Sequence, residues 1–157
     1  MPSVLKVVSG GQTGVDRAAL DAARAAGLPC GGWCPKGRLA EDGPIDSAYP
    51  LVETPSADYA QRTEWNVRDS DGTLVVARGR PKGGTALTVN LARRHGKPLL
   101  VVDLSQNPSP EEVSRWIEAG GIRVLNVAGP RESQSLAIGR EARGFLERLF
   151  RLTSIRG

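Results

Sequence analysis

The sequence predicts an α/β protein: a three-layer sandwich in which helices cover both faces of one mostly parallel, five-stranded sheet. Five short apolar runs alternate along the chain with five segments of helical periodicity. Such alternation produces a parallel sheet whose strands are connected by helices. With 157 residues, 39% of them hydrophobic and 24% charged, the chain is expected to form a single domain over residues 1–157.

The first half of the chain is expected to hold two strands, two helices and a long loop. The apolar run 4–9 predicts a strand, and the alanine-rich segment 14–26 predicts a helix that stops at a glycine. The next apolar segment, "PCGGWCP", has room for one short strand. Residues 35–55 form a loop rich in glycine, proline and aspartate, and loops of this length are usually functional or disordered. Ser56 is the expected cap of a helix that runs to Arg68.

The second half alternates strand and helix without a long break. Its expected elements are, in chain order, a strand over 71–77, a helix over 85–95, a strand over 97–104, a helix over 109–120, a strand over 122–128 and a helix over 135–151. Pro110 suits the first turn of its helix, and Gly120 suits the stop. The closing helix has an apolar face, which we expect to pack on the sheet or, alternatively, to pair with another subunit of a homo-oligomer.

Composition narrows the class of ligand. The net charge is only +4 and aromatic residues make up 4% of the chain, whereas nucleic-acid binders usually interleave a basic stripe with aromatic side chains. An anionic small molecule is the better expectation, with no nucleic acid and no membrane as partner. Two cysteines are too few for a disulfide framework. We see no signal peptide and no apolar run long enough to span a membrane, so the expected location is the cytoplasm.

Three of the expected strands end in glycine-rich turns that precede a helix. These turns are "SGGQTG" (9–14), "RGRPKGGT" (78–85) and "NVAGPRES" (126–133). Backbone N–H groups and the positive ends of the helices would then face one rim of the sheet, where α/β proteins bind ligands. No turn matches the Walker A or the dinucleotide-binding pattern. Glycine turns are common in any parallel sheet, but three together favour a site for a nucleotide or another phosphorylated ligand.

Residues in and near the three turns are the binding candidates. They are Gly10, Gly11, Gln12, Thr13, Gly14, Asp16, Arg17, Lys36, Lys82, Gly83, Gly84, Thr85, Gly129, Arg131 and Ser133. Lys82, Arg80 and Arg131 are the best-placed cations, because glycine leaves room for an anion beside them. Asp16 has two interpretations: it forms a capping box with Thr13, or it accepts a hydrogen bond from a ligand hydroxyl.

Acidic residues and cysteines supply fewer candidates. Four acids are weighed for catalysis: Asp16, Glu41, Asp42 and Asp69. Glu41 and Asp42 lie with Lys36 in the long loop, which is a candidate lid or an ordinary exposed loop. The Cys-x-x-x-Cys pair, Cys30 and Cys34, favours a packing role, because a zinc site needs more ligands and the chain has one histidine. No metal bound by protein side chains is predicted.

Several segments together resemble the putative molybdenum carrier family. They are "SGGQTGVDRAALDAA", "GGWCPKGRLAEDGPI", "YPLVET", "RTEWNVRDSDGTL" and "KGGTALT". The resemblance covers nearly the whole chain. It implies a circularly permuted version of the Rossmann-like fold of lysine-decarboxylase-like, LONELY-GUY-type proteins, with the last strand moved from the start of the chain. The implied strand order is 2-1-5-3-4, which brings the three turns together.

The same resemblance suggests two alternative functions. It implies a carrier of molybdenum cofactor (molybdopterin), or more broadly a protein that binds a phosphorylated, nucleotide-like ligand. The alternative is a nucleotide-processing hydrolase, because LONELY-GUY-type phosphoribohydrolases carry P-G-G-x-G-T-x-x-E with a catalytic glutamate. In this chain Thr88 stands where that glutamate is expected. A hydroxyl does not replace a carboxylate as a base, so whether the protein is an enzyme stays open.

Overall fold

The structure, a computed structural model, describes residues 5–156. Five parallel strands form the main sheet: β1 (Lys6–Val8), β2 (Cys30–Gly31), β5 (Gly72–Ala77), β6 (Leu99–Asp103) and β7 (Val124–Ala128). Their order is β2-β1-β7-β5-β6. The predicted order 2-1-5-3-4 is therefore confirmed, and the sheet is parallel throughout. The first residue of the expected first strand, Val4, lies outside the described residues.

The last strand in the sequence occupies the centre of the sheet. In β7, Leu125 pairs in register with Val7 of β1 and with Gly72 of β5. Leu125 and Val127 are fully buried, and Asn126 between them is buried too. Burial of successive residues is expected for a strand covered on both faces.

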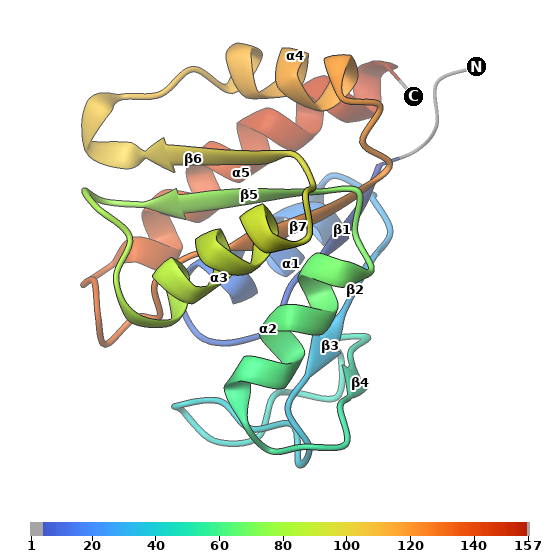
Figure 1. The fold of residues 1–157 in the computed structure, drawn as a ribbon. Helices are drawn as coiled ribbons and strands as arrows, with labels where there is room; N and C mark the ends of the chain where they lie inside the picture. The colour runs from blue at the N-terminus through green and yellow to red at the C-terminus, as the bar shows by residue number, and fades with distance from the viewer. Residues whose placement is uncertain (1–4, 157) are drawn as a thin grey trace.

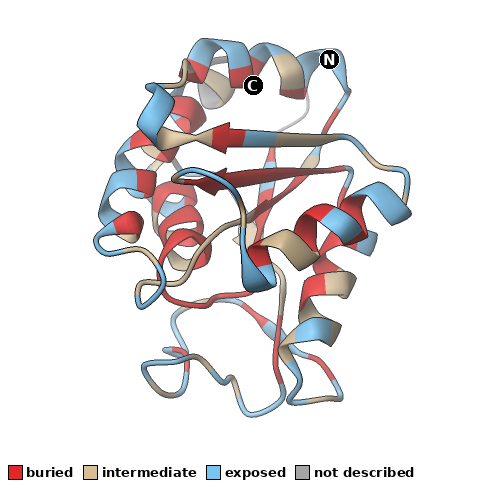
Figure 2. Cartoon of the chain, turned by 60° about the vertical axis from the view of Figure 1, so that its left-hand side comes forward, coloured by how far each residue is buried: buried red, intermediate tan, exposed pale blue. Residues whose placement is uncertain are grey.

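Helices form a layer on each face of this sheet (Figure 1). The first layer contains α1 (Val15–Ala25), α4 (Pro110–Ala119) and α5 (Ile138–Arg156), and the second contains α2 (Tyr59–Arg68) and α3 (Gly83–Arg94). Buried residues concentrate on the strands and on the sheet-facing sides of the helices (Figure 2). Within the described part of the chain, no helix is both long and apolar enough to cross a membrane.

The apolar face of α5 is part of the main core. Phe145, Leu146, Leu149 and Phe150 are at most 2% exposed and lie in the same cluster as the strand side chains. The packing interpretation of this helix is thus confirmed. Homo-oligomerisation remains a prediction, which light scattering would test.

Glycine divides the predicted strand "PCGGWCP" into two strands that belong to different sheets. Cys30–Gly31 pairs with β1, whereas β3 (Trp33–Cys34) pairs with β4 (Val52–Glu53) in a separate two-stranded sheet. Between them Gly32 has φ +128°, and a Cβ there would lie 2.3 Å from the carbonyl oxygen of Ser9. Only glycine permits this approach. The short β4 forms inside the segment that was expected to be an unstructured loop.

Three predicted helix starts are shifted. Asp58, not Ser56, caps α2 by accepting a hydrogen bond from the Ala60 N–H. Helix α3 begins at Gly83, two residues earlier than expected. Helix α5 begins three residues later than expected, because Ala137 takes a left-handed conformation with φ +60° and ends the preceding turn.

Candidate functional site

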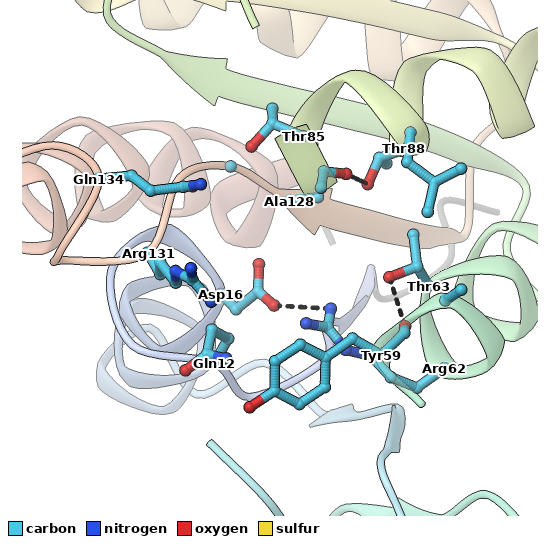
Figure 3. A pocket seen from close by; sticks show the side chains of 14 residues that line it. Gln12, Asp16, Tyr59, Arg62, Thr63, Thr85, Thr88, Ala128, Arg131 and Gln134 are labelled. Carbon is cyan, nitrogen blue, oxygen red and sulfur yellow. Dashed lines mark hydrogen bonds and ion pairs between the residues drawn. The ribbon is translucent and has the colours of Figure 1, made fainter. Parts of the chain in front are cut away.

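The three glycine turns meet at the carboxyl edge of three adjacent strands, β1, β7 and β5. A cleft with about 650 Å³ of empty space, including its open mouth, lies between them and the start of α2. Its polar side chains come from all three turns and from α2 (Figure 3): Gln12, Asp16, Tyr59, Arg62, Thr63, Thr85, Thr88, Arg131 and Gln134.

An ion pair forms one wall of the cleft. The Arg62 Nη1 lies 3.2 Å from the Asp16 Oδ2, and the two side chains are only 13% and 4% exposed. Burial raises the pKa of Asp16 above its usual value, against the opposing effects of Arg62 and of the backbone N–H groups of Gln12 and Gly129. Asp16 is therefore a carboxylate that depends on Arg62 for compensation of its charge.

Sequence reasoning missed Arg62. No motif marks this residue, and only the packing of α2 beside the first turn brings it to Asp16. The only feature of the first turn that relates to Arg62 is Gly10: a Cβ at this position would lie 2.3 Å from the Arg62 Nη1, so a larger residue would clash with the arginine. The glycine of the first turn leaves room for the protein's own guanidinium.

The interpretation of Thr13 and Asp16 as a capping box is wrong. Gly14 is the N-cap of α1, and no side chain caps it. The Thr13 hydroxyl instead donates to the Glu41 carboxylate and accepts from the Glu132 N–H at 3.1 Å. The Thr13 N–H, which Asp16 would accept from in a capping box, donates to the Gln12 Oε1 at 3.0 Å.

The second turn presents the N-terminus of α3 to the cleft. Gly84 and Thr85 line the cleft, and the space where a Cβ of Gly84 would stand is empty of protein atoms within 4 Å. The first N–H groups of a helix have no partner inside the helix and favour anions. Thr88 also lines the cleft, but its hydroxyl donates to the Gly84 carbonyl at 3.1 Å.

The third turn contributes Arg131 and Gln134. Gly129 lines the cleft as well, yet its main constraint is internal: a Cβ there would lie 2.1 Å from the Val76 carbonyl oxygen. Arg131 is 40% exposed and lies 3.4 Å from Glu41. Ser133 is not among the described residues that line the cleft, and it donates to Glu41 with both its N–H and its hydroxyl.

Unsatisfied donors gather around the first turn. In the described part of the chain, three buried side-chain nitrogen or oxygen atoms have no hydrogen-bond partner, and all three are arginine Nε atoms: Arg17, Arg62 and Arg131. Buried polar groups without a partner are rare and need an explanation. Two of these three arginines line the cleft.

The long loop docks on α1 and is not placed over the cleft. Asp42 pairs with Arg17 at 2.6 Å, and this contact lowers the pKa of Asp42. Arg38 donates to four backbone carbonyls of the loop and so holds its shape. The exposed Lys36 and Lys82 are not among the described residues that line the cleft.

The remaining candidates lie elsewhere. Asp69 follows α2 at the end remote from Tyr59, where it binds Arg68 and the Trp33 indole N–H. Cys34 is fully buried, Cys30 partly so, and burial raises the pKa of both thiols. No group of three or more His, Cys, Asp or Glu that could hold a metal occurs among the residues that the structure describes.

The fold and the permuted position of β7 define a circularly permuted, Rossmann-like α/β protein. The chain belongs to the circularly permutated YpsA SLOG family, whose model matches residues 7–150. It is also similar to a crystal structure titled "Putative molybdenum carrier protein" from Syntrophus aciditrophicus SB. The two chains are 46% identical, the match covers 95% of this chain and 96% of the other, and the TM-score is 0.88. A search of curated proteins finds no match. The family resemblance predicted from the sequence is thus confirmed.

Proposed function

We propose that the cleft binds a phosphorylated, nucleotide-like small molecule, and that the protein carries this ligand without converting it. One observation supports the proposal most: Arg62 and Arg131, whose buried Nε atoms make no hydrogen bond, line the same cleft as the N-terminus of α3. A phosphate has enough oxygens to accept from an arginine and from helix N–H groups together.

Molybdenum cofactor is the first ligand to test. The similar crystal structure is named as a molybdenum carrier, and the pterin part of this cofactor carries a phosphate. The donors of the cleft suit that phosphate, since they are cationic or belong to a helix N-terminus. The open mouth of the cleft leaves space for a ring system beyond the phosphate.

Isothermal titration with molybdopterin and with a panel of nucleoside monophosphates tests the proposal. We expect saturable binding to the wild-type protein and an affinity about ten-fold lower for Arg131→Ala, from the loss of a charge-assisted hydrogen bond of about 1.5 kcal/mol. Arg94→Ala, at the far end of α3, is the matched control and should bind as the wild type does. No binding of any ligand would end the proposal.

A hydrolase remains the second candidate because of Asp16. It is the acidic residue among those that line the cleft, and burial raises its pKa, as is common for catalytic acids. The assay is release of base or ribose phosphate from nucleoside monophosphates. Turnover that Asp16→Asn abolishes, with binding retained, would favour the enzyme. No turnover across the panel would favour the carrier.

A further inference from the structure

Glu41 lies in a ring of donors that has the composition of a phosphate site. Its Oε2 accepts from the Thr13 hydroxyl and from the Ser133 N–H, the latter at 3.2 Å. Its Oε1 accepts from the Ser133 hydroxyl at 2.5 Å and lies 3.4 Å from the Arg131 Nε. We call Thr13, Ser133 and Arg131 the oxyanion cradle.

The cradle is built by two distant parts of the chain. Thr13 belongs to the first glycine turn and Ser133 to the third, and the Glu132 N–H fixes the Thr13 hydroxyl at 3.1 Å. Glu41 itself comes from a third segment, the docked loop, and its side chain is 21% exposed. The donors therefore belong to the rigid edge of the sheet, whereas the acceptor belongs to the loop.

A carboxylate leaves part of the cradle unused. The Arg131 Nε is buried and makes no hydrogen bond, even though Glu41 is its ion-pair partner. The Glu41 oxygens are oriented toward Thr13 and Ser133, and in this orientation Oε1 lies 3.4 Å from the Arg131 Nε without forming a hydrogen bond. A phosphate offers further oxygens in a tetrahedral arrangement and can accept from the guanidinium as well.

The cradle shares Arg131 with the cleft, and Gln12 of the cleft holds the backbone of Glu41. Arg131 lines the cleft and pairs with Glu41. Gln12 also lines the cleft, and its Oε1 accepts from the backbone N–H of Glu41 at 2.8 Å. An anion in the cradle would thus lie beside a ligand in the cleft.

We propose that the cradle is a second phosphate-binding site, that Glu41 occupies it in place of the anion, and that a phosphate group displaces the Glu41 side chain when it binds. This inference deepens the proposed function. It rests on that function only where it assumes that a ligand occupies the neighbouring cleft. A ligand with two phosphate groups would use the α3 N-terminus for one and the cradle for the other.

Displacement also gives the docked loop a way to respond to ligand. Glu41 joins the loop to both the first and the third turn, while the neighbouring Asp42–Arg17 pair joins it to α1 alone. Loss of the Glu41 side-chain contacts would free the loop from Thr13 and Ser133 and leave it attached through the Glu41 N–H to Gln12 and through the Asp42–Arg17 pair. Because the carboxylate is tethered, it competes with phosphate at a high effective concentration.

The test is a titration of the whole protein with inorganic phosphate, in which calorimetry or ³¹P NMR measures the binding. Removing the tethered competitor in Glu41→Ala should tighten phosphate binding at least ten-fold relative to the wild type. Asp42→Ala removes the adjacent carboxylate, which lies outside the cradle, and should leave phosphate affinity unchanged. Adding Ser133→Ala to Glu41→Ala should reverse most of the gain. Circular dichroism checks folding, and Glu41→Gln replaces Glu41→Ala if the latter does not fold.

The outcomes separate this inference from the proposed function. Equal phosphate affinity for the wild type, Glu41→Ala and Asp42→Ala would overturn the cradle, even if nucleoside monophosphates bind the cleft. A gain in Glu41→Ala that Ser133→Ala reverses would support the cradle, even if no nucleoside monophosphate binds. If Glu41→Ala also tightens binding of a nucleoside diphosphate, but not of the nucleoside, the cradle receives a phosphate of the ligand in the cleft.

Discussion

The first and the second glycine turns look alike in sequence but are used in opposite ways. In the first turn, a Cβ on Gly10 would meet the Arg62 guanidinium at 2.3 Å, and one on Gly11 would meet Leu51 at 2.5 Å. In the second turn, the position of a Cβ on Gly84 has no protein atom within 4 Å. The first turn is filled by the protein itself, whereas the second is open to the cleft.

This difference shows what a glycine turn in a sequence can and cannot indicate. Glycine signals that something approaches the backbone closely, but the partner can be a side chain of the same chain or a ligand. Here the partner of the first turn comes from α2 and from the docked loop, both far away in sequence. In the second turn a Cβ on Gly83 would meet only the Gln134 side chain, at 3.3 Å, and one on Gly84 would meet no described protein atom within 4 Å, so this turn has room for a ligand.

The largest expected effect of a single change is at Gly14. This residue has φ +79°, and a Cβ would lie 2.2 Å from the Pro130 carbonyl oxygen. Gly14→Ala combines a left-handed conformation with a backbone clash, so we expect a loss of about 3 kcal/mol or more in the free energy of unfolding. Urea denaturation measures it. Wild-type stability in this variant would contradict the description of the first turn as filled.

A second large effect is expected when Arg62 is removed. Arg62→Ala leaves the Asp16 carboxylate buried without its partner, and we expect a loss of about 3 kcal/mol at pH 7. The pKa of Asp16 is raised in the folded state, so stability from this group falls as pH rises above the ordinary pKa of 3.8. Removing Arg62 raises that pKa further, so the deficit should be larger at pH 7 than at pH 5. Denaturation at both pH values checks this, and a pH-independent deficit would contradict it.

A smaller effect, on binding, is expected at the second turn. Gly84→Ala should keep the fold and raise stability by up to about 1 kcal/mol, because alanine is the better helix former. The new methyl group would project into the open approach to the α3 N-terminus and weaken nucleoside monophosphate binding by about ten-fold, or about 1.4 kcal/mol. Calorimetry gives the affinity and urea denaturation the stability. Unchanged affinity would show that the ligand does not use this turn.

The smallest effect concerns pH and the docked loop. Hydrogen bonds from the Ser133 and Thr13 hydroxyls hold the pKa of Glu41 below its ordinary value of 4.5. Stability from this carboxylate is therefore present above pH 4.5 and is lost as pH falls through the lowered pKa. Glu41→Gln should show less loss of stability below pH 4.5 than the wild type does. Parallel pH profiles for the two proteins would contradict the role of Glu41.

Much of the fold could be predicted from the sequence, because the signals are local. Apolar runs and helix stops mark each strand and helix within a few residues, and the resemblance supplies the position of β7. The small β3–β4 sheet could not be predicted, since it depends on Gly32 fitting against Ser9. Gln12, Thr85 and Arg131 were predicted because they lie in the turns that line the cleft.

The missed parts of the site depend on contacts between distant segments. Arg62 lies 46 residues from Asp16 in the sequence and reaches it only through the packing of α2. Glu41 was a candidate catalytic acid, and its contacts with two glycine turns had no sequence signal. Asp69 was also a candidate catalytic acid, but it precedes β5, whereas the cleft lies at the carboxyl ends of the strands.

The most direct test of the account is an amide ¹H–¹⁵N NMR titration of the wild-type protein with a nucleoside monophosphate. We predict that the amide signals of Gly83 and Gly84 shift most, because their N–H groups lie at the open end of α3, before the Thr85 N–H that donates to the Lys82 carbonyl. The signals of Gly10 and Gly11 should move little, because side chains of the protein cover them. The largest shifts at Gly10 and Gly11, with Gly83 and Gly84 unchanged, would contradict the central claim that a nucleoside monophosphate binds at the open Gly84 end of the second turn and not at the covered glycines of the first.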